Sequence, residues 1–496
     1  MLFSNSKQIL KILGVLLIVV LILWHESGLQ IRPHQMLKAM DIVLAYVPQG
    51  VRSVLGFPTT EGSIGKSQEN GISLKVPDVI DYEVVEERGT INVKTFGAKG
   101  DGVADDTAAV QKAINSIPSS GGKVFIPAGT YMIEALQSIR LQSNVTLLME
   151  KRAVLKAIPN RAERYAVLTI ENVSNVTVIG GVIEGERVRH SGNKGQWGTG
   201  IQISGAKNIT IKGTAANECW GDGFYIGTET FTGDDLGKIL TVPENIQLID
   251  VRANHNRRQG ISVIAGRNVE ILRPQLTNTE GQDPQAGIDI EPNDPTDIVE
   301  NITVVDAFTK RNSGAGVLIN LTELFGTKTP ANIKIINHRD DGSERGMFMI
   351  DDNRKDNITP GNVLIENPEW VNAQKCGLSI SNHDHRSYSI IVKNPHITNA
   401  NRNALRFDTV SGSAIAIYHD RGNIPARTGS LGNITIYNPV ITDTGTVSKT
   451  IAPFYIWDDI PGRPIQYLSI IDPVIGGSLA KVSISDGIKS YIKYTQ

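Results

Sequence analysis

The chain has 496 residues, of which 40% are hydrophobic, 6% aromatic and 20% charged. The hydrophobic share is enough for a core and excludes a disordered chain. Its 49 lysines and arginines are balanced by 51 aspartates and glutamates, so the formal net charge is −2. This balance argues against nucleic acid as a partner. Only 2 cysteines are present, which excludes a small scaffold framed by disulfides.

An apolar run covers residues 12–24 and follows Lys7 and Lys11. Basic residues before an apolar run are typical of an export signal with a cytoplasmic N-terminus. No small-x-small cleavage pattern follows, which favours an uncleaved signal anchor. A cleaved signal stays open, since the run is short for a hydrocarbon core of about 30 Å. We expect a transmembrane anchor over 1–30, a membrane-proximal stalk and linker over 31–88, and a domain over 89–496 on the periplasmic or extracellular side.

A repeated unit follows Thr90. Each unit has one strand with alternating apolar residues, a polar stretch, and a second strand that begins at glycine. The first strands begin at Asn245, Asn268, Asn301, Asn332, Asn362, Ser389, Asn433 and Tyr467, and the second at Gly223, Gly260, Gly287, Gly316, Gly346 and Gly377. Short strands that repeat at this spacing, without helical periodicity, predict an all-β parallel β-helix. The recurring asparagine predicts a polar ladder along one corner.

A helix is expected at the start of the solenoid, where an exposed coil end needs a cap. Between residues 106 and 117, Val110, Ala113, Ile114 and Ile117 fall on one helical face. Asp105 or Asp106 would be the N-cap. Residues 123–131 then predict the first strands.

The same region carries a family resemblance. Residues 96–114 read Phe-Gly-Ala-Lys-Gly-Asp-Gly-Val-Ala-Asp-Asp-Thr-Ala-Ala-Val-Gln-Lys-Ala-Ile, and residues 121–131 read Gly-Gly-Lys-Val-Phe-Ile-Pro-Ala-Gly-Thr-Tyr. Together they resemble the opening of the pectate-lyase/rhamnogalacturonase/epimerase-like superfamily. The resemblance implies a single-stranded right-handed parallel β-helix over roughly residues 90–480. It also implies action on polysaccharides as a hydrolase, lyase, C5-epimerase or phage tailspike, and so indicates the scaffold better than the reaction.

Catalytic patterns of two subfamilies are missing. The polygalacturonase set (Asn-Thr-Asp, Asp-Asp, Gly-His-Gly, Arg-Ile-Lys) does not occur in order, and neither does the Asp-Pro-His pattern of alginate epimerases. Pectin and alginate are therefore not supported as substrates.

Outward positions of the second strands gather acidic residues. When these strands are aligned on their glycines, three adjacent coils bring Asp222, Tyr225, Asp289 and Glu291 to one patch. Asp289 and Glu291 are two apart on a strand, so they face the same side about 6.5 Å apart. Paired carboxylates are what glycosidic cleavage requires, one as acid and one as base or nucleophile. Solvated surface acids are the alternative interpretation.

Basic and aromatic residues lie near this patch. Arg257 or Arg258 could bind a carboxylate or sulfate of an acidic sugar, and His255 could serve as a base. Trp197 and Trp220 are candidate sugar-stacking platforms. Ordinary packing or surface ion pairs would explain each of them equally well.

Metal and disulfide signals are weak. His383-Asp-His385 lies in a loop without a third ligand. Calcium could bind the acidic pairs Asp234-Asp235, Asp340-Asp341 and Asp351-Asp352, but solvated turns are the default, so we expect no cofactor. Cys219 and Cys376 should lie five coils apart, about 24 Å, and should be free thiols.

The sequence favours a membrane-anchored exported glycoside hydrolase that cleaves a bacterial exopolysaccharide or capsule-like polymer. Asp222, Asp289 and Glu291 would be the carboxylates, with Arg258 as a substrate clamp. A polysaccharide lyase or C5-epimerase would instead use Tyr225 or His255 to abstract a proton from a uronate. A third hypothesis is a non-catalytic polysaccharide-binding scaffold. The sequence gives no signal for trimerisation.

Overall fold

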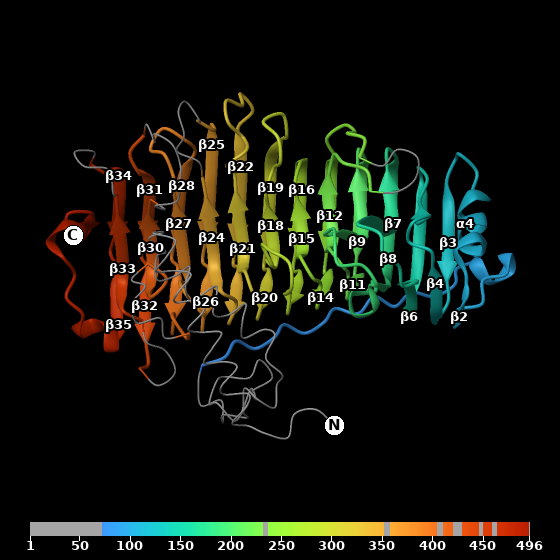
Figure 1. Cartoon of the computed structure of the whole chain (residues 1–496), viewed down its shortest axis with the longest axis horizontal. Coiled ribbons are helices and arrows are strands. Elements are labelled where there is room, and N and C mark those ends of the chain that lie inside the picture. The colour runs from blue at the N-terminus through green and yellow to red at the C-terminus, as the bar shows by residue number, and fades with distance from the viewer. Residues whose placement is uncertain are drawn as a thin grey trace, which may run out of the picture. The chain divides into compact units, whose positions relative to one another are not determined.

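The computed structural model shows a parallel β-helix, drawn in Figure 1 as a row of coils that follow one another along the axis. It describes residues 72–231, 237–351, 358–403, 410–419, 429–445, 450–458 and 464–495, all within a unit that spans residues 71–496. The apolar run over 12–24 lies outside the described residues. Within those residues, no helix has the length and hydrophobicity to cross a membrane.

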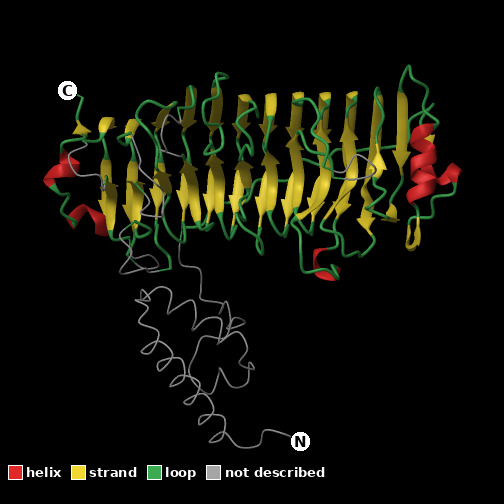
Figure 2. Ribbon diagram, turned by 45° about the horizontal axis from the view of Figure 1, so that its top comes forward, coloured by secondary structure: helices red, strands yellow, loops and turns green. Residues whose placement is uncertain are grey.

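Most coils contribute three strands, drawn in yellow in Figure 2, whereas β6 (Val145–Ala157) and β8 (Ser174–Glu184) each run through two strand positions. One coil consists of β12 (Asp222–Gly227), β13 (Glu244–Ile249) and β14 (Arg252–Asn254), and β15 (Gln259–Val263) begins the next. Strands at the first position form an 11-stranded sheet, and those at the other two positions form a 25-stranded sheet. Pairing between coils is parallel throughout. The predicted parallel β-helix is therefore confirmed.

Alternate apolar residues of every strand fill the inside of the coils. Ile246 of β13 pairs with Ile209 before it and Val269 after it, and all three are fully buried. The same column continues with Ile302. Because burying each such side chain stabilises the fold by about 1.5–3 kcal/mol, continuous columns hold neighbouring coils in register.

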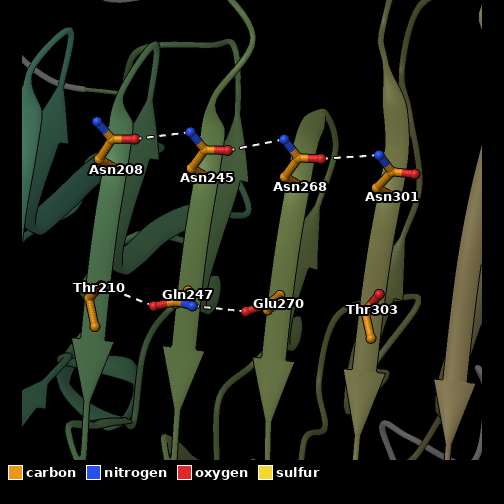
Figure 3. Close-up of a pocket in the computed structure, with 8 residues that line it drawn as sticks. All are labelled: Asn208, Thr210, Asn245, Gln247, Asn268, Glu270, Asn301 and Thr303. Atoms are coloured by element: carbon orange, nitrogen blue, oxygen red, sulfur yellow. Dashed lines mark hydrogen bonds between the residues drawn. The ribbon is translucent and has the colours of Figure 1, made fainter.

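Asparagines form the expected ladder at the corner before the second strand position. Figure 3 shows four of them, from β10 (Lys207–Lys212), β13, β16 (Gly266–Leu272) and β19 (Val299–Val305). Each side-chain amide donates to the asparagine of the preceding coil, at 3.0 Å from Asn245 to Asn208 and 3.1 Å from Asn301 to Asn268. All four have φ of 55–57°, the left-handed conformation that asparagine tolerates better than most residues.

From β12 to β27 (Leu378–Ser381), a glycine stands at or beside the start of each first-position strand. At Gly223, Gly260, Gly287, Gly316 and Gly346, the backbone of the next coil is too close for a side chain. A Cβ at Gly287 would lie 2.6 Å from the carbonyl oxygen of Gly316 and 2.8 Å from Cγ2 of Thr309. The repeated glycine noted in the sequence thus marks the corner where the chain turns into the 11-stranded sheet.

The predicted cap is helix α4 (Thr107–Asn115), at the end of the row beside β3 (Gly122–Ile126) in Figure 1. Val110, Ala113 and Ile114 are fully buried against the first coil. Asp106 is the N-cap residue, but its carboxylate accepts from the amides of Lys99 and Gly100. The backbone amide of Thr107, in the first turn of the helix, donates to Asp105 at 2.9 Å. The side chain of Asp105, and not that of the N-cap residue Asp106, therefore accepts from the helix.

Residues 72–88 form an extended strap along the third strand position, although they were expected to belong to the stalk and linker. The strap appears in blue along the lower edge in Figure 1. Its contacts run from the coil of Asn372, which donates to the carbonyl of Ile72 at 2.7 Å, to Lys123 of β3, which pairs with Glu87 at 2.5 Å. Leu74 is buried against Phe308 and Val371.

A polar cluster lies inside the solenoid. His338 and Asp340 are fully buried and contact Thr309, whose hydroxyl lies 2.9 Å from His338 Nε2 and donates to Asp340 at 2.6 Å. Trp370 donates to His338 Nδ1 at 3.1 Å. Burial raises the pKa of Asp340 to about 7 and lowers that of His338 to about 3. The pair Asp340-Asp341 is therefore no solvated turn, because Asp340 points into the core.

Candidate active site

The expected stacking of the first-position strands is confirmed. Tyr225 of β12 pairs with Ser262 of β15, Ser262 with Asp289 of β18 (Ile288–Ile290), and Asp289 with Leu318 of β21 (Ala315–Asn320). Asp222 pairs with Gln259 at the start of the same strands. The acidic residues therefore lie on the first and third of three consecutive coils of one sheet.

Arg258 holds the acidic residues together. Its Nη1 lies 3.1 Å from Asp222 Oδ2, and its Nη2 lies 3.6 Å from Glu291 Oε2. Ser262 donates to Asp222 at 2.8 Å, and Gln259 donates to Asp289 at 2.6 Å. We call Asp222, Arg258, Asp289 and Glu291 the carboxylate cluster. It places three carboxyl groups and one guanidinium on the outer face of the 11-stranded sheet.

The carboxylate cluster is far less exposed than its outward position suggested. The side chains of Asp222 and Asp289 are 2% and 0% exposed, whereas that of Glu291 is 22% exposed. Oδ1 of Asp289 and Nε of Arg258 are buried without a hydrogen-bond partner. Buried polar atoms are normally paired, so these two atoms are exceptions within the cluster. Glu291 is the carboxylate of the cluster that reaches the surface.

Burial and mutual repulsion favour protonation within the cluster. Desolvation raises the pKa of Asp289 well above its ordinary value, and the neighbouring Glu291 carboxylate raises it further. Desolvation also raises the pKa of Asp222, although Arg258 opposes that shift. One guanidinium cannot neutralise three carboxylates in a buried site. These effects favour the protonated form of Asp289.

Tyr225 and Trp197 lie in an apolar cluster beside this site. Tyr225 packs against Phe231, with ring centroids 4.5 Å apart, and against Ile264, while Trp197 is partly buried on the same cluster. Burial raises the pKa of Tyr225, which opposes its use as a base. The guanidinium of Arg164 lies 4.1 Å from the centroid of a Trp197 ring and covers one face of it.

Trp220 has neither ring face open for a sugar. His190 stacks on it with centroids 3.9 Å apart, and Arg257 lies 3.8 Å from the ring centroid. Two groups at that distance must lie on opposite faces, since on one face they would overlap. The expected stacking of a sugar on Trp220 therefore has no platform here. Arg257 is engaged with Trp220, whereas the adjacent Arg258 points into the carboxylate cluster.

His255 lies at the opposite side of the same turn. Its Nδ1 is 3.3 Å from Glu218 Oε1, and its side chain is about half exposed. Arg187 donates to its carbonyl at 2.7 Å. These contacts connect His255 to the corner after β14 and not to the carboxylate cluster, so they do not support it as a base for a substrate bound at Glu291.

The contacts of His383 and of the two cysteines bear on the weak metal and disulfide signals of the sequence. His383 uses Nδ1 with Asp351 at 3.0 Å and Nε2 with the carbonyl of Tyr388 at 2.9 Å, so neither nitrogen can bind a metal. The described residues contain no group of three or more potential metal ligands, while Asp234, Asp235 and Asp352 lie outside them. Cys219 and Cys376 are buried free thiols, as expected.

Sequence analysis missed several residues that complete the site. Gln259, Ser262 and Asn320 stand in the same columns as the acids, and Asn320 donates to Glu291 at 2.7 Å. Their column positions were the signal that could have identified them. Glu186 gave no such signal. Its buried carboxylate contacts His190 Nδ1 at 2.7 Å and the hydroxyl of Tyr165, and burial raises its pKa.

A second candidate site is the open groove on the outer face of β10, β13, β16 and β19, which we call the ladder face. Its volume is about 470 Å³, and Figure 3 shows the eight residues that line it: Asn208, Thr210, Asn245, Gln247, Asn268, Glu270, Asn301 and Thr303. Gln247 donates to Glu270 at 2.8 Å and the asparagines bond to one another. Its polar groups mainly satisfy each other, which argues for a structural role.

Residues 90–314 match the family model described as rhamnogalacturonase A/epimerase, pectate lyase-like. Over these 225 of its 496 residues, the chain is similar to the pectate-lyase-like superfamily. The matched range contains every residue of the carboxylate cluster.

Curated relatives match only part of the chain. It is 28% identical to the uncharacterized protein YclG of Bacillus subtilis (strain 168) over 222 residues, which is 40% of this chain and 38% of that protein. It is 29% identical to the mannuronan C5-epimerase AlgE6 of Azotobacter vinelandii over 184 residues, which is 34% of this chain and 20% of that protein. The chain thus covers well under half the length of these relatives.

A solved structure confirms the architecture. The A-module of the mannuronan C-5 epimerase AlgE4 of Azotobacter vinelandii superposes with a TM-score of 0.57 at 17% identity. The match covers 78% of this chain and 95% of that module. At this identity the likeness establishes the β-helix fold alone.

Proposed function

We propose that the protein is a glycoside hydrolase that cleaves a bacterial exopolysaccharide or capsule-like polymer outside the cytoplasm, anchored through its N-terminal apolar segment. The observation that carries the proposal is the carboxylate cluster, in which three carboxyl groups surround Arg258 and Glu291 reaches the surface. Two carboxyl groups in different protonation states are the requirement of glycosidic cleavage.

The roles follow from charge and burial. Burial and the neighbouring Glu291 raise the pKa of Asp289, which favours a proton on this pair. The pair acts as the general acid, and Glu291 passes the proton to the glycosidic oxygen because it is the exposed member. Asp222 lies at the other end of the Arg258 guanidinium and acts as the base or nucleophile. Arg258 then orients the two carboxylates, a role that differs from the substrate clamp expected from the sequence.

The comparisons support a polysaccharide substrate. The matching family model names a rhamnogalacturonase and an epimerase, and AlgE6 is named for its action on mannuronan. The AlgE6 relative keeps C5-epimerisation as the second candidate function. The contacts of Tyr225 and His255 described above give that alternative less support within this chain, since Tyr225 is buried with a raised pKa and His255 contacts Glu218 and not the carboxylate cluster.

The test is to incubate the full-length protein with acidic and neutral bacterial polysaccharides and to follow chain length and the absorbance of unsaturated uronates together. We expect shortening without absorbance. Glu291→Gln should lower the rate by about 10²-fold or more, and Asp289→Asn should lower it similarly. Glu270→Gln on the ladder face is the matched control and should leave the rate unchanged.

Other results would select the alternatives. Shortening with absorbance would indicate a lyase. Exchange of sugar protons with solvent without shortening would indicate an epimerase. Binding without either reaction, unaffected by Asp289→Asn and Glu291→Gln, would indicate a non-catalytic scaffold.

A further inference from the structure

An apolar floor continues from the carboxylate cluster along the 11-stranded sheet. Leu318 follows Asp289 in its column, and Phe348 of β24 (Arg345–Ile350) follows Leu318. Ile350 follows Asn320, the residue that bonds to Glu291. Leu318, Phe348 and Ile350 pack as one apolar group in which Phe348 and Ile350 remain partly exposed.

Arg345 borders this floor with an unused donor. Its guanidinium lies 4.4 Å from the centroid of the Phe348 ring, and its Nη1 pairs with Glu344. Its Nε is buried and has no hydrogen-bond partner. The guanidinium of Arg345, whose side chain is 13% exposed, borders the apolar floor and is suited to donate a hydrogen bond to an oxygen of a ligand.

The local charge favours an anion there. Glu344 pairs with both Arg345 and Lys375, so two cations share one carboxylate. The carboxylate cluster, by contrast, has an excess of acidic groups over its one guanidinium. An anionic group of a polymer would therefore be repelled from the cluster and attracted to Arg345, which orients the chain along the sheet.

We propose that Arg345, Phe348 and Ile350 form a second subsite, two coils from Asp289, that binds an anionic sugar residue of the polymer by its apolar ring face and its acidic group. This proposal rests on the proposed function, because it assumes that the carboxylate cluster acts on a saccharide. Two coils correspond to about 10 Å along the axis. The subsite is therefore reached by an oligosaccharide and not by a sugar bound at Glu291 alone.

The ladder face is a weaker candidate for such a subsite. Its groove has a volume of about 470 Å³, but the side chains that line it bond to each other. Among the residues described, none of its atoms is a buried donor or acceptor without a partner. Arg345 has such an atom. Arg267, an arginine on the first residues of β16 beside the ladder face, pairs with Glu244 and Glu300 at 3.0 and 2.7 Å and serves as a matched control.

The experiment measures binding of the full-length protein to defined microbial oligosaccharides of two and of at least four sugars. Each anionic oligomer is paired with its carboxyl-reduced counterpart. We expect Arg345→Ala to weaken binding of the longer anionic oligomers about tenfold, with little effect on disaccharides or on the reduced counterparts. Arg345→Lys should recover part of the loss. Arg267→Ala should bind as the wild type does.

Thermal unfolding of each variant shows that it is folded, and turnover of the parent polymer separates this proposal from the proposed function. If the wild type cleaves a polymer and Arg345→Ala shows unchanged KM and unchanged preference for length and charge, the subsite proposal is wrong and hydrolysis stands. If binding depends on Arg345 but no reducing ends appear, the subsite stands and hydrolysis is wrong. If the wild type binds no oligomer, both are wrong.

Discussion

The ladder face and the outer face of the 11-stranded sheet are made by the same coils but differ in how they treat polar groups. On the ladder face, amides and hydroxyls repeat from coil to coil and bond to their neighbours in the open (Figure 3). On the other face, three carboxyl groups and a guanidinium are nearly buried and leave atoms unpaired. Regular repetition of polar groups stabilises a solenoid. In this chain, the departure from repetition coincides with the candidate active site.

The largest difference between the two faces should appear in stability. Arg258→Ala would leave the buried carboxyl groups of Asp222 and Asp289 without a cation and should lower the free energy of unfolding by about 3–5 kcal/mol. Arg267→Ala removes a half-exposed arginine with two surface partners and should change it by less than about 1 kcal/mol. Urea unfolding of both variants at pH 7 checks this. Equal losses of unfolding free energy in the two variants would contradict the proposed difference between the two faces.

A carboxyl group inside the coils extends the comparison to the core. Because the pKa of Asp340 is raised to about 7, the folded protein keeps a proton that the unfolded chain loses above pH 4. Stability should therefore fall as pH rises from about 4 to 7, by as much as about 4 kcal/mol, and stay level above that range. Asp340→Asn should lessen this decline, while the raised pKa values of Asp289, Asp222 and Glu186 keep the rest of it. Unfolding measured at pH 4.5 and pH 7.5 tests it, and an unchanged slope in the variant would contradict it.

The ladder itself should tolerate change better. Asn268→Ala removes two ladder hydrogen bonds and places alanine at a φ of 55°, so we expect a loss of about 2 kcal/mol. Asn268→Gly should lose less, since glycine accepts that φ. Thr303→Ala on the same face should be within about 0.5 kcal/mol of the wild type. If Thr303→Ala lowered the free energy of unfolding as much as Asn268→Ala does, the stabilising effect would belong to all residues of the groove and not to the asparagine ladder.

The smallest effect is expected on the strap. Tyr82→Phe removes a hydroxyl that donates to Asp250, while Arg273 still pairs with that carboxylate at 2.7 Å. We expect the free energy of unfolding to fall by about 1 kcal/mol. Limited proteolysis between residues 72 and 88 should quicken severalfold while the coils stay protected. Cleavage unchanged from the wild type would show that Tyr82 does not hold the strap.

Much of this architecture is readable from sequence because it repeats. The strand positions, the asparagine ladder and the stacking of Asp222, Asp289 and Glu291 follow from residues that recur at equivalent positions. The cap around Val110 follows instead from the helical spacing of its apolar residues. A repeat is a strong signal since each coil adds an independent observation of the same geometry.

What does not repeat could not be predicted. Whether loops cover a strand depends on their tertiary packing, so the burial of Asp289 was hidden. Arg257 and Arg258 are adjacent in sequence, yet one stacks on Trp220 and the other enters the carboxylate cluster. The strap has no periodicity, and the contact between Glu186 and His190 depends on one irregular loop.

The strap also determines where a mechanical load enters the molecule. Within the described residues, the strap begins at the coil of Asn372, in the C-terminal half of the solenoid, and runs back past earlier coils to Lys123. A pull on Ile72 is therefore first borne at the coil of Asn372, and the contacts of the strap break one after another before the load reaches the first coil. The capping helix and the first coil feel that pull only after the strap has detached, so the end where the core is most open to unravelling is shielded from force.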